Sequence, residues 1–218
     1  MRRATLPGRG PTLNAPWRSG SRCWGPTHPE TAGSLNSLGA LLRMQGDLAR
    51  ARPYHDRALA INEQVLGPTH PDTATSLNNM GYLLYAQGDL AGARPYVERA
   101  LAINEQMLGL THPDTALSLN NLGKLLHAQG DLARARPYLE RALAIYEQVR
   151  GPTHLNMARN LNNLGGLLHA QGDLAGARPY LERALAIFTA RLGSQHPDTQ
   201  AVQRTLDSLD APQEDHEA

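Results

Sequence analysis

Apolar and polar residues alternate in helical stripes that recur every 42 residues between residues 27 and 200. In the unit 69–110, Leu77, Met80 and Leu84 have the spacing of one apolar helix face. After a short polar interruption a second apolar stripe follows, formed by Leu90, Ala93, Val97, Ala100 and Leu101. The pattern therefore predicts that each unit is a hairpin of two helices joined by a very short turn.

Capping residues mark the ends of both helices. The segment 69–72 (Thr-His-Pro-Asp) begins the first helix, with Thr69 as the expected N-cap and proline in the first turn. Gly88 ends that helix, Asp89 is expected to cap the second helix, and Gly109 closes it. The turn between the helices is therefore only one or two residues long.

Small residues and prolines recur at fixed positions of the unit. A glycine inside each first helix costs about 1 kcal/mol relative to alanine, so its repetition implies that a second helix approaches closely there. These glycines are Gly39, Gly81, Gly123 and Gly165, and the facing alanines are Ala51, Ala93, Ala135 and Ala177. Prolines inside the second stripe predict either a kink or a later helix start. They are Pro53, Pro95, Pro137 and Pro179.

A period of this length is typical of a solenoid, in which each unit packs only on its neighbours. The Leu-Gly pair followed three residues later by Leu, with the spaced alanines, resembles the tetratricopeptide repeat. With its Asn-Asn-Leu-Gly and His-Pro-Asp-Thr segments, the 42-residue unit is similar to the repeats of kinesin light chain and nephrocystin-3. This resemblance implies an all-α, right-handed superhelical solenoid of antiparallel helix hairpins.

The repeat phase divides the chain into four units and a capping helix. We expect an array over 27–209, made of the repeats 27–68, 69–110, 111–152 and 153–194 and a capping helix 195–209 with polar outer positions. Residues 1–26 carry five arginines and no acid, and residues 210–218 carry four acids and no base, so both are predicted to be disordered.

Charge and composition restrict the class of binding partner and the cellular compartment that we expect. Sixteen basic and sixteen acidic side chains balance over 27–209, which argues against bulk nucleic-acid or membrane binding. Cys23 is the single cysteine, which fits a reducing compartment. Because the sequence has no apolar run of membrane-spanning length and no signal-peptide pattern, we expect a cytoplasmic protein.

By the resemblance, the first helices line a concave surface, whose exposed positions form the candidate peptide site. These candidates are the asparagines Asn36, Asn78, Asn120 and Asn162, the tyrosines Tyr82 and Tyr85, the basic residues Arg43, Lys124 and Arg159, and the histidines His127 and His169. An asparagine amide can pair with any peptide bond, and the basic residues favour an acidic segment or a terminal carboxylate. The alternative is that the asparagines tie one repeat to the next, a role we also expect for Asn79, Asn121 and Asn163.

The histidines do not form a recognisable metal or catalytic pattern. Five of the nine occupy one loop position, one period apart, so they are expected to lie along an edge of the solenoid. His127 and His169 lie one repeat apart without a carboxylate or thiol beside them. No nucleophile elbow, phosphate loop or paired-carboxylate site is present in the sequence. We therefore expect neither a metal or other cofactor nor enzyme activity.

The leading interpretation is a non-catalytic scaffold or adaptor that binds an extended peptide or a helix of a partner protein in the groove. A structural role is the main alternative: the first repeat lacks a cap, so its apolar flank is available for self-association or for docking onto another molecule. The chain would in that case also fit a fragment of a larger signalling protein with such repeats. A small-ligand sensor is a third possibility.

Overall fold

The computed structural model describes residues 25–149, 151 and 153–210 of the 218-residue chain. These residues form nine helices and no strand, which confirms the all-α class. The helices are α1 Pro29–Met44, α2 Leu48–Val65, α3 Pro71–Ala86, α4 Leu90–Leu108, α5 Pro113–Ala128, α6 Leu132–Val149, α7 Leu155–Ala170, α8 Leu174–Leu192 and α9 Pro197–Asp210. Of the segments expected to be disordered, 1–26 and 210–218, the structure describes only Gly25, Pro26 and Asp210, and Asp210 is the last residue of α9. Cys23 also lies outside the described residues.

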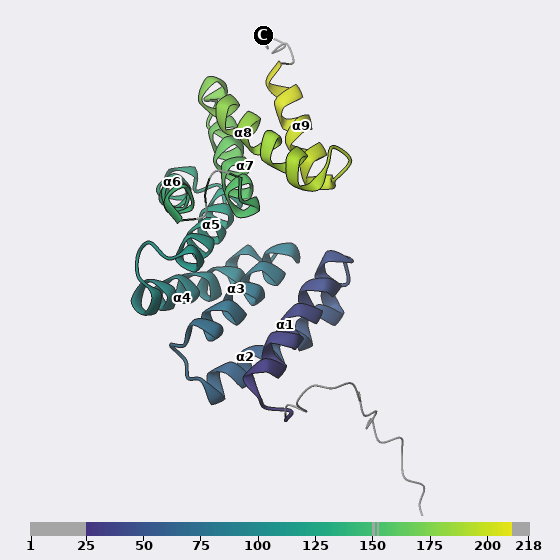
Figure 1. Ribbon diagram of the computed structural model, residues 1–218, viewed down its shortest axis with the longest axis vertical. Helices are drawn as coiled ribbons and strands as arrows, with labels where there is room; N and C mark the ends of the chain where they lie inside the picture. Colours follow the sequence, from purple (N-terminus) through teal and green to yellow (C-terminus); the bar gives the residue numbers. More distant parts are fainter. Residues whose placement is uncertain (1–24, 150, 152, 211–218) are drawn as a thin grey trace, which may run out of the picture.

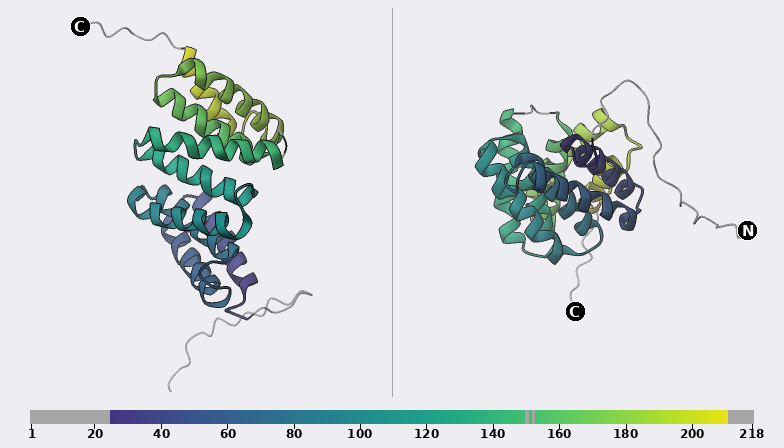
Figure 2. Two further views of the ribbon diagram at one scale, coloured as in Figure 1. Left: turned by 90° about the vertical axis from the view of Figure 1, so that its left-hand side faces the viewer. Right: turned by 90° about the horizontal axis from the view of Figure 1, so that it is seen from below.

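The helices stack as hairpins along one long axis. Each first helix packs against the second helix of its own hairpin, and each second helix packs against the first helix of the next hairpin. Figure 1 shows the resulting curved array, and Figure 2 shows the hairpins as successive layers from α1 to α9. Helix α9 covers α8 and buries Thr199, Val202 and Leu206. The expected superhelical solenoid of helix hairpins with a closing helix is confirmed.

Histidine caps the first helices, which corrects the expectation that Thr69 does so. Helix α3 starts at Pro71, so the capping position falls on the extended residue His70, whose Nδ1 accepts the backbone N–H of Asp72 at 3.1 Å. The other first helices and α9 begin with the same bond, made by His28, His112, His154 and His196. The loop histidines therefore serve the helix starts. Asp89 caps α4 as expected, since its carboxylate accepts the N–H of Gly92 at 2.8 Å.

The prolines lie inside the second helices, so of the two alternatives, a kink or a later helix start, the later start is wrong. Asp47 fixes the start of α2 at Leu48, well before Pro53, and α4 likewise starts at Leu90, before Pro95. A capped first turn is thus stable enough to carry the chain into the proline, which removes one backbone donor from the helix.

The glycines of the first helices lie where the two helices of a hairpin approach most closely. A Cβ atom built on Gly123 would lie 2.7 Å from Leu139 side-chain carbons and 3.2 Å from the carbonyl oxygen of Ala135. On Gly81 it would lie 2.5 Å from Val97. Because real carbon contacts are longer, the glycine is required sterically, and the facing alanines are fully buried. The close approach expected from the sequence is confirmed.

We predict that Gly123→Ala destabilises the protein although alanine favours helices. Overpacking costs about 1–3 kcal/mol, which outweighs the gain of about 1 kcal/mol in helix propensity. Gly166→Ala is the matched control, because its Cβ would meet only His127, at 3.9 Å, and it should stabilise α7. Urea unfolding followed by circular dichroism compares the two midpoints. Equal shifts of both variants in the same direction would contradict the steric argument.

Candidate peptide-binding groove

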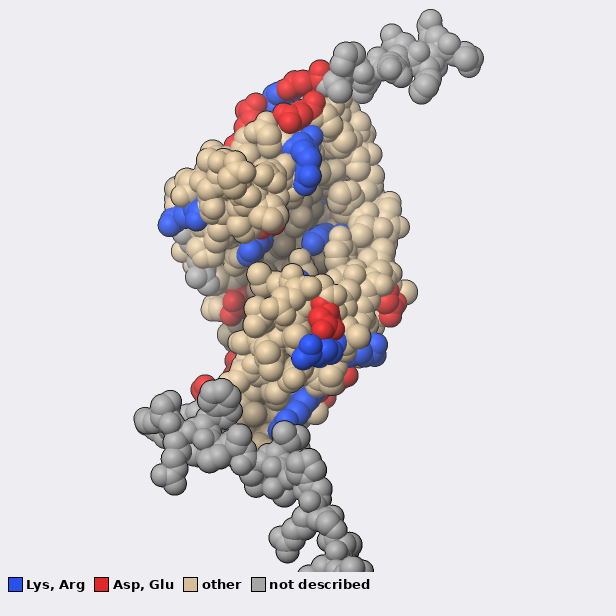
Figure 3. Space-filling view, turned by 90° about the vertical axis from the view of Figure 1, so that its right-hand side faces the viewer, with Lys and Arg blue, Asp and Glu red and all other residues tan. Residues whose placement is uncertain are grey.

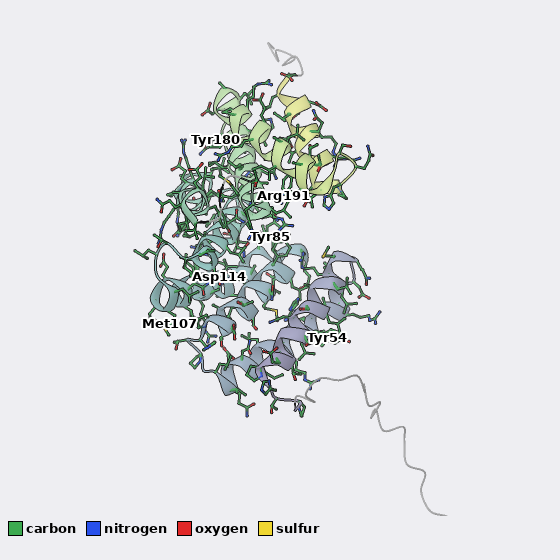
Figure 4. The ribbon with its side chains drawn as sticks, in the orientation of Figure 1. Tyr54, Tyr85, Met107, Asp114, Tyr180 and Arg191 are labelled. Carbon is green, nitrogen blue, oxygen red and sulfur yellow. The ribbon has the colours of Figure 1, made fainter. Side chains whose placement is uncertain are left out.

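The first helices contribute side chains to one hollowed face of the array. Figure 3 views this face, where lysine and arginine side chains lie in and around the hollow. Figure 4 shows Tyr85 on the side of the molecule that faces the opening, with Met107 at the opposite edge. Tyr82, Tyr85 and Lys124 line a shallow depression here. Helices α3 and α5 therefore meet at the centre of the groove.

Two tyrosines and two basic residues from three successive first helices form a compact cluster. The guanidinium carbon of Arg43 lies 4.0 Å from the ring centroid of Tyr82. Lys124 Nζ lies 4.9 Å from the Tyr82 centroid and 4.4 Å from that of Tyr85. The two rings are 6.1 Å apart and tilted. At these distances each cation and the aromatic ring that it faces attract each other, which restrains both side chains and leaves positive charge at the surface.

Neither the positive charge of this cluster nor that of Arg159 on α7 is neutralised by a salt bridge within the described residues. Arg43, Lys124 and Arg159 form none of the salt bridges found there. Arg159 only donates to the Asn156 amide oxygen, at 3.4 Å. Burial alone would raise the pKa of Tyr82, but Lys124 and Arg43 outweigh burial and lower that pKa. The groove centre thus carries basic side chains without a carboxylate partner among the described residues.

Three of the four candidate asparagines are buried and bonded to the next repeat. Asn36 Nδ2 donates to Ser76 Oγ at 2.9 Å, and Asn78 Nδ2 donates to Ser118 Oγ at 2.8 Å. Asn36, Asn78 and Asn120 are only 8%, 6% and 7% exposed. These contacts support the alternative that the asparagines tie one repeat to the next.

The neighbouring asparagines complete these ties. Asn121 donates to Asn78 Oδ1 at 3.3 Å, and Asn163 donates to Asn120 Oδ1 at 2.9 Å, as expected for repeat-to-repeat contacts. Asn162 differs, because it is half-buried and makes no side-chain hydrogen bond in the described part of the chain. Of the four candidate asparagines, Asn162 is therefore best placed to meet a ligand.

The two groove histidines lie one repeat apart on α5 and α7. His127 is half-buried, and burial lowers the pKa of its imidazole. His169 is half-buried as well. Over residues 25–149, 151 and 153–210, no three His, Cys, Asp or Glu side chains gather closely enough to hold a metal ion.

His55 is a buried polar residue that the sequence analysis missed. It is fully buried, and its ring packs where a Cβ on Gly39 would lie, at 2.7 Å. Its Nδ1 donates to Asn36 Oδ1 at 3.2 Å, while its Nε2 has no hydrogen-bond partner among the described residues. Burial, and then Arg43, lowers the pKa of His55. The available signal was the departure from Val97 at the equivalent position of the next repeat.

The fold and the groove place the chain in the class of superhelical arrays of helix hairpins. The tetratricopeptide repeat profile matches residues 30–106, 77–148, 114–190 and 156–206, so the chain belongs to the tetratricopeptide repeat family. No curated protein sequence matches the chain significantly. No described helix combines the length and the apolar composition that crossing a bilayer requires.

Solved structures of similar proteins share this architecture. The nearly identical tetratricopeptide-like repeats of a protein named for the kinesin light chain, from Podosopora anserina, are 25% identical to this chain. That match covers 84% of this chain and 86% of the other, with a TM-score of 0.66, and a variant of the same repeats gives 0.67 at the same identity and coverage. BtubC (BKLC) from P. vanneervenii is 25% identical, with a TM-score of 0.69, over 83% of this chain and 72% of that one.

We predict that Asn78→Ala and Asn162→Ala affect stability differently. Removing the Asn78 amide takes one of the two amide donors from buried Ser118, which keeps Asn104, and leaves half-buried Asn121 without its acceptor, which costs about 1–2 kcal/mol. Asn162→Ala removes no hydrogen bond from the described structure and should change stability by about 0.5 kcal/mol or less. Thermal and urea unfolding measure both, and similar losses would contradict the assignment of Asn78 as a tie between repeats.

We predict that His55 makes stability depend on pH. The pKa of His55 is lowered in the folded chain, whereas in the unfolded chain it is about 6.5. As the pH falls, His55 is therefore protonated first in the unfolded chain. The contribution of neutral His55 is fully present above that pH, and the free energy of unfolding falls as pH drops toward the folded pKa. In His55→Val the free energy of unfolding should change less steeply with pH, by up to about 1.4 kcal/mol per pH unit. Parallel pH profiles of both proteins would contradict this.

Proposed function

We propose that the chain is a non-catalytic scaffold that binds an extended, acidic segment of a partner protein in its concave groove. The observation that carries the proposal is the set of three basic residues from three different first helices that lack a carboxylate partner in the described structure. Such charges favour an anionic ligand, since nothing in the described chain competes for them. A cytoplasmic setting suits this role.

The tyrosines give the proposed site its second component. Tyr82 and Tyr85 are half-buried and held by the cations beside them, so little side-chain freedom is lost on binding. Tyrosine and arginine are the residue types that dominate binding energy at interfaces. We place the acidic side chains or terminal carboxylate of the ligand at Lys124 and Arg159, and its peptide backbone near Asn162.

The distribution of charge favours a ligand that runs along the groove. Arg43, Lys124 and Arg159 belong to α1, α5 and α7, so a single short side chain would meet only part of the set. An extended segment with several acids can approach all of them. His127 and His169 line the same path and can donate or accept hydrogen bonds. The asparagines Asn36, Asn78 and Asn120 then act indirectly, by fixing the spacing of the first helices.

Self-association through the first repeat is the second candidate function. Leu38 and Leu41 on the outer face of α1 are exposed. Exposed aliphatic side chains side by side are typical of a contact surface. Sedimentation across a range of concentrations tests this candidate directly, and a concentration-independent monomer would contradict it.

We predict that Lys124→Gln/Arg159→Gln weakens acidic-peptide binding about tenfold or more, which equals about 1.4 kcal/mol. The probe is an immobilised library of extended peptides with fixed Asp and Glu positions, followed by fluorescence anisotropy on the selected sequences. Binding should also weaken as salt concentration rises.

The matched control is Arg94→Gln/Arg136→Gln. These arginines lie on the second helices and pair with Glu98 and Glu140, so the control removes the same charge outside the groove. It should leave the affinity nearly unchanged. Equal losses in both double variants would show a net-charge effect and overturn the groove assignment.

A further inference from the structure

The outer face of α1 differs from the same face of every other first helix. Leu38 is 40% exposed and Leu41 is 51% exposed. Their equivalents are at most 3% exposed, namely Met80, Leu83, Leu122, Leu125, Leu164 and Leu167. The described residues therefore leave uncovered on α1 a face that is covered everywhere else in the array.

The internal junctions show what covers this face. Helix α2 packs on α3, and its buried Asn62 donates through Nδ2 to Ser76 Oγ at 2.9 Å and to the carbonyl oxygen of Asp72 at 3.0 Å. Helix α4 does the same on α5, where Asn104 donates to Ser118 Oγ at 3.0 Å and to the Asp114 carbonyl at 3.1 Å. A serine at this position is thus matched by an asparagine on the covering helix.

At the two later junctions, both the serine of the first helix and the asparagine of the covering helix are replaced. Where α6 covers α7, Tyr146 takes the asparagine position and Asn160 takes the serine position, and both are buried. Where α8 covers α9, the pair is Phe188 with Val202, again buried. The serine position is thus bonded to an asparagine at two junctions, and the valine of α9 is covered by an apolar side chain.

Helix α1 carries the serine type of this position. Ser34 Oγ donates to the Glu30 carbonyl at 3.1 Å, so both groups that receive an asparagine at the internal junctions are present. The loop before α1 also keeps the internal geometry, because Thr31 bonds to the Gly25 carbonyl at 2.9 Å as Thr73 bonds to that of Gly67 at 2.8 Å. The face thus has the form that accepts an asparagine-bearing helix.

We propose that the outer face of α1 is a docking site for an amphipathic helix of another polypeptide, with an aliphatic ridge and one asparagine, of the type of α4. The ridge covers Leu38 and Leu41, and the asparagine amide bonds to Ser34 Oγ and the Glu30 carbonyl. This site is separate from the groove and extends the packing that already joins the repeats.

The chain's own helices cannot fill this site in a second copy without opening the array. Asn62 and Asn104 are 3% and 2% exposed within their junctions. At the other end, α9 presents exposed Gln200, Gln203 and Arg204 instead of an aliphatic ridge. Because the asparagine-bearing helices of a second copy are already buried in their own junctions, we assign the site to a helix of a different protein, and a dimer is an alternative outcome of the test.

The experiment uses two helical peptides with the α4 sequence, residues 90–108, and the full chain. One peptide keeps Asn104 and the other carries Asn104→Phe, which copies the residue of α8. Both are stapled between positions 102 and 106, which are exposed and lie opposite Asn104 on the helix. The receptors are the wild-type chain and Ser34→Val, which copies the residue of α9. Fluorescence anisotropy gives the four affinities.

We expect the wild-type chain to bind the asparagine peptide about fivefold more tightly than the phenylalanine peptide, because an unpaired amide or hydroxyl is costly. Ser34→Val should reverse this order. Leu41→Glu, with unchanged helicity, should lose both peptides.

Three outcomes would overturn the proposal. They are no binding of the asparagine peptide up to about 1 mM, an order of affinities that Ser34→Val leaves unchanged, and equal binding by Leu41→Glu. Sedimentation completes the test: a wild-type dimer that Leu41→Glu dissociates would assign the face to a second copy instead.

Discussion

The close approach of the two helices at one glycine of each hairpin is the constraint on which the array depends. With no side chain at Gly81, Gly123 or Gly165, the second helix lies against the first and its aliphatic residue fills the contact. This fixes the thickness of every layer. Because each layer packs only on its neighbours, a constant thickness gives a regular superhelix and sets the spacing of side chains along the groove.

Amide side chains connect these layers. Asn78, bonded to Ser118, crosses from one first helix to the next, and Asn62, bonded to Ser76, crosses from a second helix to the following first helix. In a buried setting such bonds select one register, since any slip leaves a polar group unpaired. The asparagines that the sequence suggests as peptide-binding residues thereby fix the shape of the groove.

The groove gains its character from residues that break the repeat. The other units carry different residues at the positions of Tyr82, Tyr85 and Lys124, and these three side chains come together through cation–aromatic contacts across α3 and α5. His55 is another departure, a buried imidazole where other units place an aliphatic side chain. The repeated residues build the scaffold, and the exceptions give its faces distinct chemistry.

The sequence by itself determined the helix hairpins, their phase and the requirement for glycine, because helix periodicity and steric demand repeat with the same 42-residue period. It also placed the candidate groove residues on the first helices, where the structure has them. Only the tertiary structure decided that His70 caps α3, that Pro53 lies within α2, and that Asn36, Asn78 and Asn120 are buried while Asn162 is more open. For the asparagines the reason is that their bonding partners lie about forty residues away, so the residue in the next repeat decides whether the amide is bonded within the array or open to a ligand.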